Sequence, residues 1–318
     1  AGQPVLARQI STRGLRLTPP LGRRVPAPPL SMGTVDHVIW RSRPALDRPV
    51  LLAAFEGWND AGDAASGAVR YLIDRYDGEL VAEIDPEEFF DFTSSRPQAE
   101  IDDDGVRHIV WPSTSVYATT LPGDAGDALL LIGTEPQLRW RTFCAQITGL
   151  AQELGCRLVV ILGALVAEVP HSRPVPVVGT VSDPALQADL GLRPSTYQGP
   201  TGVVGVLSSA CRDAGIAAAS LWAAVPTYVP TAPSPKAVLA LLEQTSEVLG
   251  MWVPTTDLEI AAAAYELQVT ELVQEDDETS DYVTQLEERH DADEHDGTAG
   301  RSLVEEVERF LRDRPDRP

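Results

Sequence analysis

The stretch PVLLAAFEGWNDAGDAA, residues 49–65, decides the fold of this chain. Its first seven residues are apolar without alternation, a pattern typical of a strand buried on both faces of a parallel sheet. After the loop 56–59, alanines recur on one face of a predicted helix from about 60 to 74, which lets that helix lie close to the sheet. Strand, turn and helix in this order predict the repeating unit of an α/β fold.

The same unit recurs along the chain. Further buried strands are predicted at 127–133, 157–163 and 216–225, and further helices at 134–154, 201–214 and 235–249. Residues 80–125 differ, and they predict a hairpin and an antiparallel extension of the sheet. Their short strands are expected at 80–84, 106–111 and 115–120. We therefore expect a three-layer α/β sandwich with a mostly parallel central sheet.

Composition divides the chain into three regions. Residues 1–34 are expected to form an Arg- and Pro-rich arm, extended or disordered, and residues 35–254 the α/β core domain. Residues 255–318 are expected to form an acidic helical appendage, in which apolar residues recur every seven positions from Leu258. No apolar run reaches the roughly 18 residues of a membrane span, and no signal-peptide core is visible, so we expect a cytoplasmic protein.

The charge of the chain narrows the class of its partners. The net charge is -22, although residues 1–31 carry five arginines and no acid, so the body is more acidic still. An acidic body repels phosphate backbones and anionic headgroups, and we expect no nucleic acid and no membrane among its partners. The three cysteines are an odd number without paired spacing, which predicts buried free thiols and no disulfide framework.

Four blocks of sequence carry a resemblance to a known family. They are FEGWNDAGDAA (55–65), GTEPQLRWR (133–141), GPTGVVGVL (199–207) and SLWAAVPTYV (220–229). Taken together, the blocks resemble the bacterial branch of the proteasome assembly chaperone two family, and the likeness runs from about residue 35 to 312. It implies a phosphorylase- and hydrolase-like sandwich, a homo-oligomer, and a protein partner for which a proteasome component is the candidate.

The C-terminal end departs from part of that family. Some archaeal relatives dock on proteasome rings through a tail of a hydrophobic residue, a tyrosine and any residue. Residues 312–318 read RDRPDRP instead. Docking by that route is therefore not expected.

Eight residues are candidates for a pocket or a partner contact. They are Glu56, Trp58, Asn59, Asp60, Glu135, Arg139, Thr201 and Tyr228. Loop 56–63 lies at a strand-to-helix junction, where α/β sheets bind ligands. Its glycines can simply permit the turn while its carboxylates cap the helix. Alternatively, the loop lines a polar pocket for a neutral or cationic group, or it contacts a protein.

The other candidates also leave two interpretations open. Glu135 and Arg139 are four residues apart on a predicted helix, either as a solvated ion pair or with Glu135 facing a pocket. Thr201, in an acid-free turn, either caps the next helix or helps to bind an anion. Tyr228 is expected at a pocket rim, and His171, in a long Pro-rich loop, is expected at the surface.

No stretch of the chain matches a catalytic or cofactor motif. A P-loop, a Gly-x-Ser-x-Gly elbow, a Gly-x-Gly-x-x-Gly turn, a His-Glu-x-x-His pair and a Cys-x-x-Cys pair are all missing from the sequence. We therefore expect no cofactor, no metal and a non-catalytic protein that acts through protein contacts. The alternative is an enzyme or small-molecule binder, related to nucleosides or phosphate, that uses the phosphorylase-like cleft. Convergence of the candidates on one pocket would favour that alternative.

Overall fold

A computed structural model of the chain describes residues 37–295, apart from residue 103 and short gaps at 182–185, 188–189, 191 and 193–197. The predicted arm 1–34 and the end of the predicted appendage, 296–318, lie outside the described residues. No helix among those described is long and apolar enough to cross a membrane.

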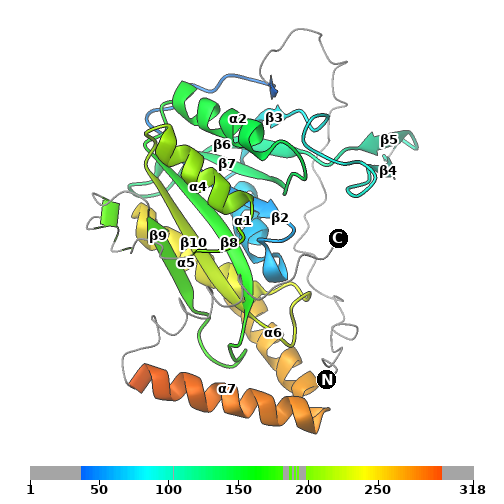
Figure 1. Cartoon of the computed structure of the whole chain (residues 1–318), viewed down its shortest axis with the longest axis vertical. Helices are drawn as coiled ribbons and strands as arrows, with labels where there is room; N and C mark the ends of the chain where they lie inside the picture. The colour runs from blue at the N-terminus through cyan, green and yellow to red at the C-terminus, as the bar shows by residue number, and fades with distance from the viewer. Residues whose placement is uncertain are drawn as a thin grey trace.

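Strands and helices alternate through most of the chain (Figure 1). The strands are β1 (Val38–Trp40), β2 (Val50–Glu56), β3 (Glu79–Ile84), β4 (Gln98–Ile101), β5 (Arg107–Val110), β6 (Thr114–Leu121), β7 (Gly126–Thr134), β8 (Leu158–Ala167), β9 (Val177–Val181) and β10 (Ala218–Pro226). The helices are the short 3-10 turn η1 (Ala61–Asp63), then α1 (Ala64–Arg75), α2 (Trp140–Glu153), α4 (Val203–Asp213), α5 (Pro235–Leu249), α6 (Thr256–Gln274) and α7 (Asp277–His295).

The main sheet has eight strands in the order β1-β3-β6-β7-β2-β8-β10-β9. Its centre is parallel as predicted, because β2 pairs in parallel with β7 and β8, and β8 with β10. Antiparallel strands extend both edges: β6, β3 and β1 on one side and β9 on the other. The hairpin and the antiparallel extension predicted for residues 80–125 are confirmed, since β5 pairs with β4 in a separate ribbon while β6 joins the main sheet.

Helices cover both faces of this sheet and make the predicted three layers (Figure 1). Along β2, Leu51, Ala53 and Phe55 face α2 and α4, and the alternate side chains face α1 and α5. The small alanines of α1 are fully buried against the sheet, as the sequence predicts. A strand enclosed by two helical layers has no polar face, which explains the unbroken apolar run at 50–55.

The helices α6 and α7 follow the core and pack on its α5 side. They share an apolar cluster with the segment after β10, built from Tyr228, Val229, Tyr265, Val269, Val273, Val283 and Leu286. The predicted amphipathic helix at 258–272 is confirmed as α6. Its buried face docks α6 and α7 against the end of the parallel sheet.

Candidate functional site

The loop after β2 is held in place by the end of β8. Gly57 takes a left-handed φ of 115°, so the chain can turn sharply there without the strain of a side chain. The carbonyl oxygen of Asn59 then accepts a hydrogen bond of 2.7 Å from the backbone N–H of Ala164, and Asp60 forms a parallel bridge with that residue. The loop therefore crosses the carboxyl ends of β2 and β8, where α/β sheets bind ligands.

Glu135 joins this loop to the start of α4. Its Oε1 accepts a hydrogen bond of 2.6 Å from Asn59 Nδ2 and one of 2.9 Å from the backbone N–H of Val203, the first residue of α4. Its own N–H donates to Glu56 O at 2.9 Å. Burial raises the pKa of Glu135, and the hydrogen bonds from Val203, Asn59 and Trp58 oppose that rise. A carboxylate thus occupies the helix N-terminus, the place where a free anion would otherwise bind.

Asp60 caps the helix α1. Its Oδ1 accepts hydrogen bonds from the backbone N–H groups of Ala65 and Ser66, at 2.7 and 3.1 Å. Of the interpretations left open for this loop, capping of the helix by a carboxylate therefore applies to Asp60, although Asp63 is the residue directly before α1. Burial raises the pKa of Asp60 from 3.8 to about 6, against the lowering effect of the Ser66 side chain and of these two backbone hydrogen bonds. Neither Asp60 Oδ2 nor Asn59 Oδ1 has a hydrogen-bond partner among the described residues, although both side chains are buried.

Glu56 and Trp58 lie at the edge of the same junction. Glu56 forms an ion pair with Arg70 of α1 and accepts a hydrogen bond of 3.3 Å from Thr134 Oγ1. Trp58 is 36% exposed, and its indole lies so close to Gly202 that a Cβ there would be 2.8 Å from Trp58 Cε3. This contact requires glycine at the start of α4.

One predicted helix boundary was wrong, and so were two of the interactions considered for the candidate residues. Helix α2 begins at Trp140, not at 134, because Arg139 takes a left-handed φ of 52° and the chain before it is a loop. Arg139 therefore pairs with Glu88 and not with Glu135. Thr201 does not cap α4. The N-cap residue of α4 is Gly202, which has no side chain to form a capping hydrogen bond, and Glu135 of another segment accepts the hydrogen bond from Val203 N instead.

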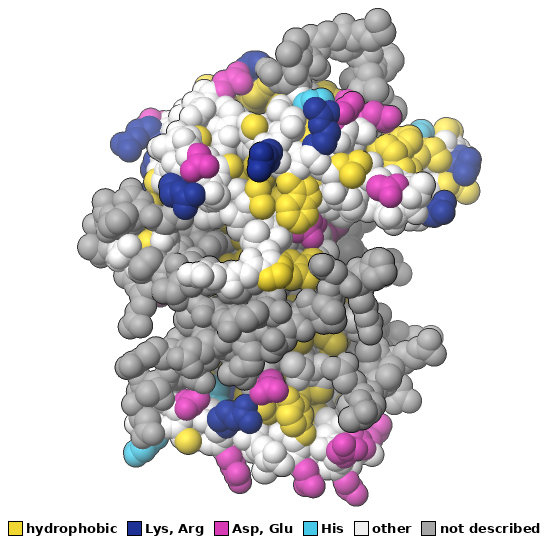
Figure 2. Space-filling view, viewed as in Figure 1, with side chains coloured by type: hydrophobic (Ala, Val, Ile, Leu, Met, Phe, Trp, Pro, Cys, Tyr) yellow, Lys and Arg dark blue, Asp and Glu magenta, His cyan; other side chains and the backbone are white. Residues whose placement is uncertain are grey.

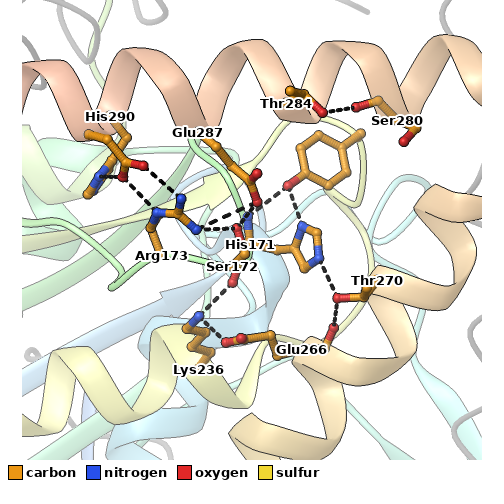
Figure 3. A network of polar contacts seen from close by, with 12 residues as sticks. His171, Ser172, Arg173, Lys236, Glu266, Thr270, Ser280, Thr284, Glu287 and His290 are labelled. Carbon is orange, nitrogen blue, oxygen red and sulfur yellow. Dashed lines mark hydrogen bonds and ion pairs between the residues drawn. The ribbon is translucent and has the colours of Figure 1, made fainter.

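Tyr228 does not belong to this junction but to a second polar cluster, shown in Figure 3. Its hydroxyl lies 2.7 Å from the backbone nitrogen of His171, which donates to it, and 2.8 Å from His171 Nδ1. Tyr228 and His171 are only 5% and 4% exposed, so the surface position expected for the histidine was wrong. The helices that bury it, α6 and α7, come about a hundred residues later in the chain.

The hydrogen bonds assign the tautomer of His171. Thr270 donates its hydroxyl proton to Glu266 O at 2.8 Å, so Thr270 Oγ1 can only accept from His171 Nε2, 3.0 Å away. The proton of the neutral ring is therefore on Nε2, and Tyr228 donates to Nδ1. Burial lowers the pKa of His171, Lys236 lowers it further, and Glu266 and Glu287 act in the opposite direction.

The segment 171–173 connects the core to both appended helices (Figure 3). Lys236 of α5 donates to the carbonyl oxygen of His171 at 2.6 Å and pairs with Glu266 of α6. Arg173 binds both carboxylate oxygens of Asp291 on α7, at 2.7 and 2.8 Å. The sequence analysis missed this cluster. The available signal was an arginine in a long loop together with the many acidic residues of α7, which could have suggested an ion pair between the two segments.

Neither cluster has the composition of a metal or thiol site. The described part of the chain holds no group of three or more His, Cys, Asp or Glu that could bind a metal ion. The cysteines Cys144, Cys156 and Cys211 are free, and burial raises their pKa values, to about 11 for Cys211. Such thiols are protonated at neutral pH and are poor nucleophiles.

A sequence model of the PAC2 family matches residues 54–273, which include the junction at Glu135 and the second cluster except for its residues on α7. The chain belongs to the PAC2 family. A crystal structure of a PAC2 family protein from Streptomyces avermitilis is 46% identical, with a TM-score of 0.68, over 74% of this chain and 99% of that one. A Mycobacterium tuberculosis proteasome-assembly chaperone homologue is 45% identical, with a TM-score of 0.67, over the same shares of the two chains.

A second Mycobacterium tuberculosis protein, of unknown function, matches more of this PAC2 chain. It is 32% identical, with a TM-score of 0.76, over 90% of this chain and 98% of its own. No curated protein matches the chain significantly. These similarities establish membership of the PAC2 family. The roles named for the relatives are known for those proteins only.

Proposed function

We propose that this PAC2 protein is a non-catalytic assembly factor that acts by binding another protein, with a proteasome component as its partner. The observation that carries the proposal is the position of Glu135. The carboxylate best placed to act on a ligand at the carboxyl ends of the strands is bound to Asn59 and to the start of α4. The junction thus ties three segments of the chain together, which is a structural task.

The neighbouring groups support the same conclusion. A general base needs a reacting proton within about 3 Å, and a nucleophile needs such a base beside it. Asp60 Oδ1 is engaged by two backbone N–H groups, and Glu56 is paired with Arg70. The identity of the partner rests on the proteasome-assembly chaperone homologue to which the chain is 45% identical.

Two further features of the proposal concern the state of the protein. We propose a homo-oligomer, from the family resemblance and from the amphipathic helices after the core. We propose a cytoplasmic location, which is supported by three free cysteines, because disulfides rather than free thiols are typical of oxidising compartments.

The proposal is tested by mixing the purified protein with the purified proteasome α and β subunits of its own host, followed by native mass spectrometry and size-exclusion chromatography. A complex, or faster assembly of subunit rings in its presence, is the expected result. A heat-denatured sample serves as the control for non-specific association. Unchanged subunit masses and unchanged assembly rates at micromolar concentrations would refute the proteasome component as partner.

A small-molecule site is the second candidate, and one observation favours it. Asn59 Oδ1 and Asp60 Oδ2 are buried acceptors without a partner, and a ligand that donates hydrogen bonds would satisfy them. A thermal-shift screen against nucleosides, nucleotides, phosphate and amino acids tests this function. A ligand at a hundred times its dissociation constant adds about 2.7 kcal/mol to the free energy of unfolding. A shift that is lost in Asn59→Ala would establish a binding site there, and the absence of any shift would count against it.

A further inference from the structure

The helix α6 has two apolar faces, and the described residues bury only one of them. The buried face carries Leu258, Ala261, Ala262, Tyr265, Val269 and Val273 and packs on the core and α7. On the other side, Ile260 is 68% and Leu267 66% exposed. A helix that is apolar on both sides is typical of an element with neighbours on both sides.

The uncovered residues form a continuous stripe along the helix. Ile260, Ala263, Ala264 and Leu267 follow the spacing i, i+3, i+4 and i+7, which places them on one face. We call these residues the α6 stripe. Its ends are large and exposed, while its middle consists of alanines. Small residues at the centre allow another helix to approach closely, and the large residues at the ends can pack beside it.

The charge around the stripe indicates which kind of helix would fit. Helix α6 contains Asp257, Glu259, Glu266 and Glu271 and no lysine or arginine. Glu259 and Glu271 are exposed, one beside each end of the stripe in sequence. Acidic side chains also gather on the neighbouring α7, at the same end of the molecule (Figure 2). A second copy of α6 would bring like charges together, whereas a basic helix would find complementary ones.

We propose that the α6 stripe binds a basic amphipathic helix of a partner protein, its apolar face laid on Ile260 and Leu267 and its cationic residues beside Glu259 and Glu271. The inference rests on the proposed function, since it names the part of the partner that this protein recognises. Two amphipathic helices that pack side by side each present apolar residues at i, i+3 or i+4, and i+7, the spacing of the α6 stripe itself.

The experiment measures binding of a fluorescent 18-residue model peptide to the full chain by anisotropy. The peptide carries leucines at i, i+3 and i+7 positions and lysines elsewhere. Saturable binding that weakens with salt is the expected result, and a peptide with glutamates in place of the lysines should not bind. Absence of saturable binding to the full chain would overturn the proposal, because the stripe would then be covered by the chain itself or by a second copy.

Matched substitutions locate the binding. Leu267→Gln should raise the dissociation constant of the peptide about tenfold, as expected for the loss of one buried leucine contact. Ile101→Gln, at a residue of the β4–β5 ribbon that is 72% exposed, makes the same chemical change elsewhere and should leave binding unchanged. Equal effects of the two substitutions would overturn the assignment to the α6 stripe.

The same Leu267→Gln variant separates this inference from the proposed function. If the variant binds proteasome subunits as tightly as the wild type does, protein binding stands and the α6 stripe is not the site. If the wild type binds no proteasome subunit but still binds the basic peptide through Leu267, the stripe stands as a docking surface and the proteasome partner is wrong.

Discussion

Replacement of Asp60 by asparagine should change how the stability of the protein depends on pH. The carboxyl of Asp60 is 5% exposed, and its Oδ2 has no hydrogen-bond partner among the described residues. Burial penalises the charged form by more than the hydrogen bonds to Ser66 and Ala65 favour it, so the pKa rises from 3.8 to about 6. Asparagine keeps an oxygen that can accept the hydrogen bonds of Ala65 and Ser66, but it carries no charge at any pH.

The sign and size of the effect follow from this shift. A carboxyl whose pKa is higher in the folded state stabilises the fold fully below the unfolded pKa, near 4, and loses that contribution as the pH rises through about 6. A shift of roughly two units corresponds to about 3 kcal/mol. Between pH 3 and 7.5, the free energy of unfolding of Asp60→Asn relative to wild type should therefore rise by about 3 kcal/mol.

Urea unfolding at a series of pH values measures this difference. Comparing the variant with the wild type at each pH cancels the contributions of all other titrating groups. The matched control is Asp213→Asn, which removes a carboxylate whose side chain is 72% exposed. Its free energy of unfolding, plotted against pH, should stay parallel to that of the wild type. If the Asp60→Asn curve also stays parallel, Asp60 titrates like an exposed carboxyl and the burial argument is refuted.

Three further outcomes are expected. Tyr228→Phe should lower the free energy of unfolding by about 1–3 kcal/mol, because it leaves the backbone N–H and Nδ1 of His171 buried without a partner, as urea unfolding would measure. Gly202→Ala should lower the free energy of unfolding by about 1–3 kcal/mol in the same assay, since the new Cβ at position 202 would lie 2.5 Å from the side-chain amide atoms of Asn59. Its control, Gly149→Ala in the middle of α2, meets nothing within 4 Å and should stabilise by up to about 1 kcal/mol. Light scattering should give a multiple of the 34.3 kDa chain mass at micromolar concentration, and a monomer mass would contradict the proposed homo-oligomer.

The parts of the fold that could be predicted from the sequence are those fixed by local pattern. The unbroken apolar runs at 50–55 and 158–163 became central parallel strands because burial on both faces excludes polar residues. Ser234 followed by proline marked the start of α5, and its hydroxyl does accept a hydrogen bond of 3.2 Å from Ala237 N. Such signals lie within a few residues of the structure they specify.

The errors arose where contacts from distant segments decided the outcome. Proline at 136 is compatible with the first turn of a helix, yet Glu135 N is bound to Glu56 and the chain turns into α2 only after Arg139. His171 is expected at the surface because it lies in a long, Pro-rich loop, and such loops usually run over the surface. Its cover comes from Thr270 and the rest of the α6–α7 pair, which no local window contains.

The two clusters give a physical account of the blocks by which the chain resembles its family. The blocks at 55–65, 133–141 and 199–207 meet where Glu135 binds Asn59 and the start of α4. The block at 220–229 contains Tyr228, which holds His171 beneath α6. Each of the four blocks thus contributes residues to contacts between segments that are distant in the sequence. The sequence features shared with the family therefore include residues that hold the fold together. This role of the blocks agrees with the proposal that a partner binds outside them, at the α6 stripe of residues 260–267.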